Sequence, residues 1–267
     1  MMLDTLPQPS RAFRWAQDDA ARPPALVCRA LEPYADHVFT TRLWTLGLPG
    51  APDTAWNEVA SAVGVDAAHL VRVRQVHAAA VVVHRPGDRA PSTLPDADIL
   101  VTGDTASAIA VQSADCVPLL LVDRQSGGVS AAHAGWRGLA AGVPARAIAA
   151  LREEFGASPA DVMVAMGPSI SGPRYEVGAD VRDRFEREHA PDAVARWFAP
   201  GDREQHWYFD GWQAARDALE SAGVPADQIF SADLCTAAHR DLLCSYRRDG
   251  AGIGRMAAAI RPRPRRP

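Results

Sequence analysis

The chain has 267 residues and a formal charge of −4, and the hydrophobic share of 48% is ordinary for a globular protein. All 28 basic residues are arginines, because the sequence contains no lysine. This absence excludes Schiff-base catalysis, pyridoxal phosphate attachment and a Walker-type phosphate loop, each of which needs a lysine amine. The slightly acidic balance argues against nucleic-acid binding, whereas arginine can still hold phosphate in a bidentate fork.

The sequence predicts a cytoplasmic protein without a membrane partner. No apolar run approaches the roughly 20 residues of a membrane span, and residues 1–22 lack the apolar stretch of a signal peptide. The cysteines are too few and too scattered for a disulfide framework, so we expect free thiols. They are Cys28, Cys116, Cys235 and Cys244.

We expect a single domain over residues 25–260, without internal repeats or a long linker. Residues 1–24 mix prolines and charges without a clear period, and predict a poorly structured extension. Residues 261–267 read RPRPRRP. We expect this tail to be disordered, because proline removes backbone donors and fixes φ.

Short runs rich in β-branched residues and bounded by Pro, Gly or Asp predict strands. They are Leu26–Arg29, His37–Thr40, Leu70–Val73, Ala79–His84, Ile99–Val101, Ala108–Gln112, Val117–Val122, Gly128–Ala132 and Val162–Met166. Apolar residues at helical spacing predict helices over Trp136–Phe155, Asp180–His189 and Gly211–Ala222. Strands and helices without strict βαβ alternation favour a mixed α/β sandwich over a doubly wound sheet.

Three reactive side chains directly follow predicted strands, where residues are exposed but held by a rigid sheet. His77 and Cys116 follow Leu70–Val73 and Ala108–Gln112, and His133 follows Gly128–Ala132 at the start of a helix. Two imidazoles and one thiolate bind zinc and leave a fourth position open for water or substrate. Alternatively, Cys116 is a nucleophile and His133 its base, without a metal.

Each of these residues also has an ordinary structural interpretation. The separations between them match no short metal-finger spacing, so only the fold can assemble a site. His77 is compatible with a surface histidine, Cys116 with an inert buried thiol, and the neighbouring Trp136 with a core anchor. Spacing alone favours these structural interpretations.

Several short blocks stand out along the chain: QVH (75–77), DADILVT (96–102), ADCVP (114–118), HAGWRG (133–138), GPSI (167–170), YEV (175–177), CT (235–236) and SYRRD (245–249). In this order they resemble the signature of the YfiH/laccase-domain family, also called the DUF152-type multi-copper polyphenol oxidoreductases. The resemblance implies an α/β (α+β) multilayer sandwich, related to the cysteine-hydrolase fold of a bacterial deamidase toxin. It also implies zinc, with copper as the alternative, held by His77, Cys116 and His133.

The resemblance further implies a purine nucleoside enzyme, namely a phosphorylase for adenosine, inosine and methylthioadenosine and an adenosine deaminase. An alternative from the same family is a peptidoglycan editing factor, a cysteine or metal amidohydrolase acting on a UDP-MurNAc-L-Ser type precursor. A copper polyphenol oxidase (laccase) is the least favoured, because multi-copper clusters need many histidines and the six outside the trio form no HxH pair. We expect small-molecule partners, a purine nucleoside and phosphate, and make no prediction of oligomeric state.

Zinc with three protein ligands suits deamination, which also needs a proton-transfer group. Asp115, next to Cys116, is the candidate, with an orienting role as the alternative. Phosphorolysis needs cations, which here must be arginines. We rank Arg42 first, then Arg247 and Arg248, and Arg137 last, because it could simply pack on Trp136.

Residues 43–50 read LWTLGLPG. Many members of the family have a glycine- and asparagine-rich loop here. We therefore expect a changed substrate-lining loop, which leaves the exact substrate open but not the metal trio.

Overall fold

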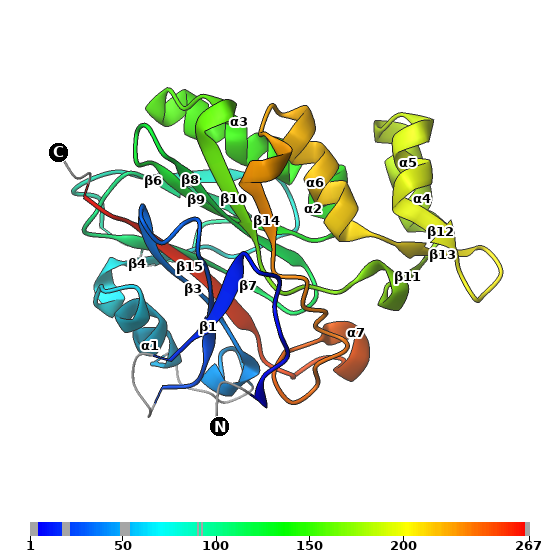
Figure 1. Ribbon diagram of the computed structural model, residues 1–267, viewed down its shortest axis with the longest axis horizontal. Coiled ribbons are helices and arrows are strands. Elements are labelled where there is room, and N and C mark those ends of the chain that lie inside the picture. Colours follow the sequence, from blue (N-terminus) through cyan, green and yellow to red (C-terminus); the bar gives the residue numbers. More distant parts are fainter. Residues whose placement is uncertain (1–4, 18–21, 49–53, 90, 92, 265–267) are drawn as a thin grey trace.

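The computed structural model describes residues 5–17, 22–48, 54–89, 91 and 93–264. Two six-stranded sheets lie at its centre, and a three-stranded sheet lies at one end (Figure 1). The first sheet has the order β1 (Phe13–Ala16), β2 (Ala25–Cys28), β3 (Ala35–Thr40), β15 (Met256–Pro262), β7 (Ala108–Ser113) and β4 (Leu70–Arg72). The second has the order β14 (Ile229–Ser231), β10 (Val162–Met166), β8 (Val117–Asp123), β9 (Val129–Ala134), β6 (Ile99–Thr102) and β5 (Val81–His84). The third consists of β11 (Glu176–Gly178), β13 (His206–Phe209) and β12 (Phe198–Pro200).

The second sheet is buried on both faces, and its central strands β8 and β10 are accordingly almost entirely apolar. Successive side chains of a strand point to opposite faces. In β8, Val117, Leu119 and Leu121 face a core shared with helices. Leu120 and Val122 face the first sheet, with which they share a second core.

Helices cover the outer faces of both large sheets (Figure 1). Over the second sheet lie α2 (Trp136–Ala140), α3 (Val143–Phe155) and α6 (Gly211–Ser221), and over the first lies α1 (Ala55–Ala62). Beside the small sheet lie α4 (Ala179–Glu188) and α5 (Pro191–Trp197), while α7 (Tyr246–Asp249) precedes β15. Short 3-10 helices occupy Arg42–Trp44, Ala67–His69, Pro159–Asp161, Gly172–Arg174 and Ala226–Gln228. The layers confirm the predicted mixed α/β sandwich.

The prediction of one helix over Trp136–Phe155 is wrong. The segment forms α2 and α3, separated at Gly142, whose φ of 78° lies in the left-handed region that favours glycine. The other two predicted helices correspond to α4 and α6. Among the residues that the structure describes, no helix has the length and apolar character needed to cross a bilayer.

The structure differs from the predictions for parts of both ends of the domain. In the supposed extension, β1 pairs with β2 and buries Phe13. In the supposed tail, β15 continues to Pro262 and pairs with β3 up to this residue. Its pairing with β7 ends earlier, at Ile260. Arg261 and Arg263 form ion pairs with Asp36. Residues 1–4, 18–21 and 265–267 lie outside the described residues.

Candidate metal centre

The fold brings His77, Cys116 and His133 together, and their potential ligand atoms all lie within 4.8 Å of one another. The Cys116 Sγ and His77 Nε2 atoms are 4.0 Å apart. The two imidazole rings are nearly perpendicular, at 80°, with centroids 4.8 Å apart. Among the described residues, this is the one such group of histidine, cysteine or acidic side chains.

Strand register accounts for two of the three positions. In the antiparallel pair of β8 and β9, Val117 lies opposite Ala134 and Pro118 lies opposite His133. Cys116, the residue before β8, is therefore held beside the end of β9. His77 lies in a separate turn between β4 and β5.

Asp98 forms hydrogen bonds both to this turn and to His133 of β9. The sequence did not identify it as a site residue. Its carboxylate is completely buried. One oxygen accepts hydrogen bonds from His133 Nδ1 at 2.8 Å and from the backbone N–H of His77 at 3.1 Å. The other accepts from the backbone N–H groups of Val76 and Ala78. Burial raises the pKa of Asp98, but the hydrogen bonds outweigh it and lower the pKa below its ordinary value. The only signal was its place inside the DADILVT block.

The electrostatics of the trio favour a thiolate. Burial raises the pKa of Cys116, but the adjacent His133 and His77 outweigh it and lower the pKa below that of an ordinary thiol. Burial lowers the pKa of His133, but the negative charges of Cys116 and Asp98 raise it overall. The thiolate is the form that binds metals and acts as a nucleophile.

Gly135, the N-cap of α2, lies against the trio. A Cβ atom at this position would lie 2.8 Å from Cys116 Sγ and 3.0 Å from His77 Cδ2. No side chain fits there without displacing a candidate ligand, which gives a physical reason for the glycine in HAGWRG.

The donor set fits a transition metal. Two imidazoles and a thiolate are ligands that zinc accepts, and copper also binds such sets. Metal-binding histidines usually donate their second ring N–H to a carboxylate or carbonyl, as His133 does to Asp98.

A cavity of about 540 Å³ contains the trio, and this volume is typical of small-molecule sites. On its walls the Arg137 guanidinium lies 4.2 Å from the ring centroid of Trp136, and the Arg247 guanidinium lies 4.6 Å from that of Tyr175. The remaining lining residues are Gln75, Gln112, Ser113, Ala114, Asp115, Tyr246 and Arg255.

Asp115 lines the cavity, but both of its carboxylate oxygens accept hydrogen bonds. Thr236 Oγ1 donates to one at 2.5 Å, and the backbone N–H of Arg247 donates to the other at 2.6 Å. These contacts tie the end of β7 to the segment that carries Arg247. Both roles predicted for Asp115, proton transfer and orientation of the neighbouring ligand, stay predictions.

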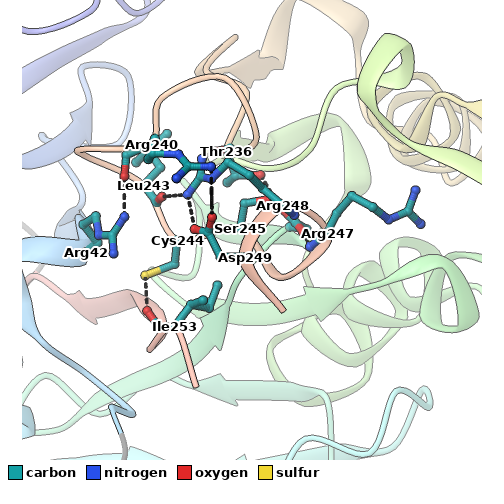
Figure 2. A network of polar contacts seen from close by, with 11 residues as sticks. Arg42, Thr236, Arg240, Leu243, Cys244, Ser245, Arg247, Arg248, Asp249 and Ile253 are labelled. Carbon is teal, nitrogen blue, oxygen red and sulfur yellow. Dashed lines mark hydrogen bonds and ion pairs between the residues drawn. The ribbon is translucent and has the colours of Figure 1, made fainter. Parts of the chain in front are cut away.

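The structure does not place all four predicted arginines at the cavity. Figure 2 shows Arg247 and Arg248 pointing in opposite directions. The Arg248 guanidinium donates to the carbonyls of Thr236 and Leu243 and pairs with Asp249. The Arg248 side chain therefore stabilises the local fold around residues 236–249.

Arg42, ranked first from the sequence, also lies outside the trio's cavity. Its guanidinium donates to the Arg240 carbonyl (Figure 2), and it lines a separate surface cavity. Arg137, ranked last, lines the trio's cavity together with Arg247 and Arg255. Sequence reasoning missed Arg255, which belongs to none of the blocks.

The prediction that residues 43–50 line the substrate site is wrong for the described part. None of residues 43–48 lines the trio's cavity. Trp44 and Leu46 are buried in the core that contains α1. The Leu46 carbonyl accepts a hydrogen bond from the backbone N–H of Arg255, so this loop supports the cavity wall from behind. Residues 49 and 50 lie outside the described residues.

Comparisons with known proteins identify relatives of this chain. A purine nucleoside phosphorylase of Deinococcus radiodurans is 34% identical over 241 residues, covering 84% of this chain and 88% of that protein. Adenosine deaminase RL5, from an unknown prokaryotic organism, is 36% identical over 210 residues, covering 76% of this chain and 78% of that protein. The match to a purine nucleoside phosphorylase of Bacteroides thetaiotaomicron is 35% identical and spans 61% of this chain and 60% of that relative.

Solved structures and a family model extend the comparison. The crystal structure of the Bacillus licheniformis hypothetical protein YfiH has a TM-score of 0.83 and 26% identity, covering 93% of this chain and 99% of that chain. The model of the multi-copper polyphenol oxidoreductase laccase family matches residues 52–263. The chain therefore belongs to this family, the one that its sequence blocks resemble.

Proposed function

We propose that this chain is a zinc-dependent purine nucleoside enzyme. It cleaves adenosine, inosine and methylthioadenosine with phosphate and deaminates adenosine. The observation that carries the proposal is the shared cavity, in which His77, Cys116 and His133 lie with three arginines. Relatives named purine nucleoside phosphorylase and adenosine deaminase support the substrate class.

His77, Cys116 and His133 would hold the zinc, with copper as the alternative. Zinc with three protein ligands supplies a Lewis acid that polarises a water or substrate oxygen at its open position. Because His133 Nδ1 donates to Asp98, the Nε2 atom of that ring is left as the donor for a metal.

The arginines would hold the phosphate in a chain without lysine. The Arg137 and Arg247 guanidiniums each lie over an aromatic ring. A guanidinium carries N–H donors along its edge, which can grip an anion while its face stacks. In phosphorolysis a phosphate oxygen bonds to C1′ of the ribose while the bond from C1′ to the purine nitrogen breaks. The aromatic side chains Trp136 and Tyr175 offer flat apolar surfaces for the base.

The test combines metal analysis with nucleoside assays. We expect bound zinc in the purified protein, free hypoxanthine or adenine only when phosphate is present, and inosine formed from adenosine. Removing a ligand should cost more than the roughly 10–100-fold typical of an outer-sphere partner, so His77→Ala should lower turnover by at least about 100-fold.

The matched control is His69→Ala, because His69 is an exposed histidine paired with Asp66 away from the cavity. It should retain full activity. Equal turnover by His77→Ala and the unsubstituted protein would show that the site assignment is wrong.

One observation favours a second candidate, a metal-independent cysteine amidohydrolase acting on a cell-wall precursor of the UDP-MurNAc-L-Ser type. Cys116, His133 and Asp98 provide a nucleophile with a lowered pKa, a base and an orienting carboxylate. This activity would survive chelation of metals and be lost in Cys116→Ser. The nucleoside activity would not survive chelation.

A further inference from the structure

We propose that Asp98 is a positioning residue that holds both histidines of the candidate metal centre, acting on His133 through its ring and on His77 through its backbone. The inference rests on the proposed metal site. It adds that the two histidines share one buried anchor, so that disturbing this anchor weakens metal binding through both of them.

The contact with His133 is set by strand register. Ile99 of β6 lies opposite Ala132 of β9, so the preceding Asp98 lies opposite His133. The backbone N–H of His133 donates to the Asp98 carbonyl at 2.8 Å, and the ring Nδ1 donates to the carboxylate at 2.8 Å. Both the backbone and the side chain of Asp98 therefore fix the orientation of this imidazole.

The contact with His77 is made by a turn that wraps the carboxylate. The consecutive backbone N–H groups of Val76, His77 and Ala78 donate to it at 3.1, 3.1 and 2.8 Å. The φ of His77 is 58°, a left-handed conformation that is unfavourable for a residue other than glycine. Converging backbone N–H groups of this kind form a nest for an anion, and here the anion is the protein's own carboxylate. The direction of the His77 side chain therefore depends on Asp98.

The Asp98→Asn substitution separates charge from volume. Four donors converge on the two carboxylate oxygens, but an amide has only one acceptor oxygen. If the amide NH₂ faces His133 and the His77 N–H, the ring must adopt the other tautomer and the His77 N–H loses its acceptor. If the amide NH₂ instead faces the Val76 and Ala78 N–H groups, the turn loses two hydrogen bonds. Either orientation disturbs the turn that carries His77.

The chain offers a matched control two residues away. Asp96 is half exposed and forms an ion pair with Arg74 on the surface. Asp96→Asn makes the same chemical change in the same segment, without touching the carboxylate that holds the histidines.

The experiment measures Zn²⁺ affinity of the metal-stripped full chain by competition with a chromophoric chelator. Outer-sphere partners of metal ligands typically contribute about 10–100-fold to affinity. We therefore expect the Zn²⁺ affinity of Asp98→Asn to fall by about this factor, and the affinity of Asp96→Asn to equal that of the unsubstituted protein. The Co²⁺ absorption spectrum should shift in Asp98→Asn alone. In His77→Ala and His133→Ala backgrounds the cost of Asp98→Asn should shrink, because the substitution acts through each histidine.

Two results would overturn the inference. One is an unchanged Zn²⁺ affinity in Asp98→Asn. The other is an undiminished cost in the His77→Ala background, which would mean that His77 does not depend on Asp98. If the unsubstituted protein binds neither metal, the proposed function fails instead.

Measurements on the unsubstituted, metal-stripped protein keep the inference testable if Asp98→Asn does not fold or no metal binds. Nitrogen-15 spectra should show His133 protonated on Nδ1. The amide hydrogens of residues 76–78 should exchange slowly, although the Val76 side chain is exposed. Protonation on Nε2 alone, or fast exchange of these amides, would contradict the anchor.

Discussion

The cavity has two walls that are built differently. The wall with His77, Cys116 and His133 consists of strand ends and the start of α2. The second wall includes Tyr246, Arg247 and Arg255 of the irregular segment 234–255, in which α7 has four residues. Strand register fixes Cys116 and His133 on the first wall, whereas side-chain hydrogen bonds hold the second.

One charged side chain gathers backbone groups in each wall, and the two charges have opposite sign. On the first wall, the Asp98 carboxylate gathers backbone N–H groups. On the second, the Arg248 guanidinium gathers the carbonyls of Thr236 and Leu243 (Figure 2). A charged residue inside a family block is therefore not evidence of substrate contact. The direction of its side chain decides its role.

The largest effect should come from breaking the first wall at Gly135. In Gly135→Ala the new Cβ would lie 2.8 Å from Cys116 Sγ, closer than Cβ atoms approach other groups, so a candidate ligand must move. Displacements of about 1 Å at a reacting centre can cost about 100-fold, and we expect at least that loss of nucleoside turnover. Turnover and bound metal are the measurements.

Gly211→Ala is the matched control, because a Cβ there would make only ordinary contacts, the nearest at 3.5 Å. It should keep its metal and its activity. Full activity in Gly135→Ala would mean that the trio is not the reacting centre.

The pH dependence of Cys116 alkylation gives the next largest effect. The pKa of Cys116 is lowered to about 6, while burial raises that of Cys28 and of Cys244 to about 11. The reactive thiolate is thus present above pH 6 and lost as the pH falls through 6. In metal-stripped protein, iodoacetamide should modify Cys116 first, about tenfold more slowly at pH 5 than at pH 7.

Peptide mass spectrometry locates the modified cysteine, and zinc-loaded protein should be protected. A Cys116 rate that does not change between pH 5 and pH 7 would contradict the electrostatic account of the first wall.

The sequence predicted the first wall better than the second, for a physical reason. Apolar runs identified β7, β8 and β9, and strand ends present their side chains in a register that the sheet imposes. The sequence could not show that Asp98 lies opposite His133, because pairing between β6 and β9 is a property of the fold. The directions of Arg247 and Arg248 depend on an irregular segment without periodicity, so the sequence could not show which of the arginines line the cavity.

The paired arginines test the second wall, with smaller effects. Arg248→Ala removes a charged donor from two backbone carbonyls and from the carboxylate of Asp249. Hydrogen bonds to charged groups contribute about 1.5–3 kcal/mol, and we expect the free energy of unfolding to fall by about that amount. The Arg247 guanidinium donates to one backbone carbonyl, that of Glu176. Arg247→Ala should therefore lower the free energy of unfolding by less than Arg248→Ala does, and it should raise the KM for phosphate about tenfold, or about 1.4 kcal/mol.

Denaturant unfolding and phosphate titrations measure the two quantities separately. A loss of stability in Arg247→Ala that exceeds the loss in Arg248→Ala, together with an unchanged KM, would reverse the assignment of the two residues.

The smallest effect should come from Arg42, the first candidate from the sequence. Its guanidinium donates to the Arg240 carbonyl outside the trio's cavity. Surface substitutions away from such a site usually change stability by no more than about 0.5 kcal/mol, and we expect Arg42→Ala to stay within that limit with an unchanged KM for phosphate. The same phosphate titration used for Arg247→Ala decides this. A tenfold higher KM would show that the two cavities act together on the substrate, and that family position located the phosphate better than side-chain direction did.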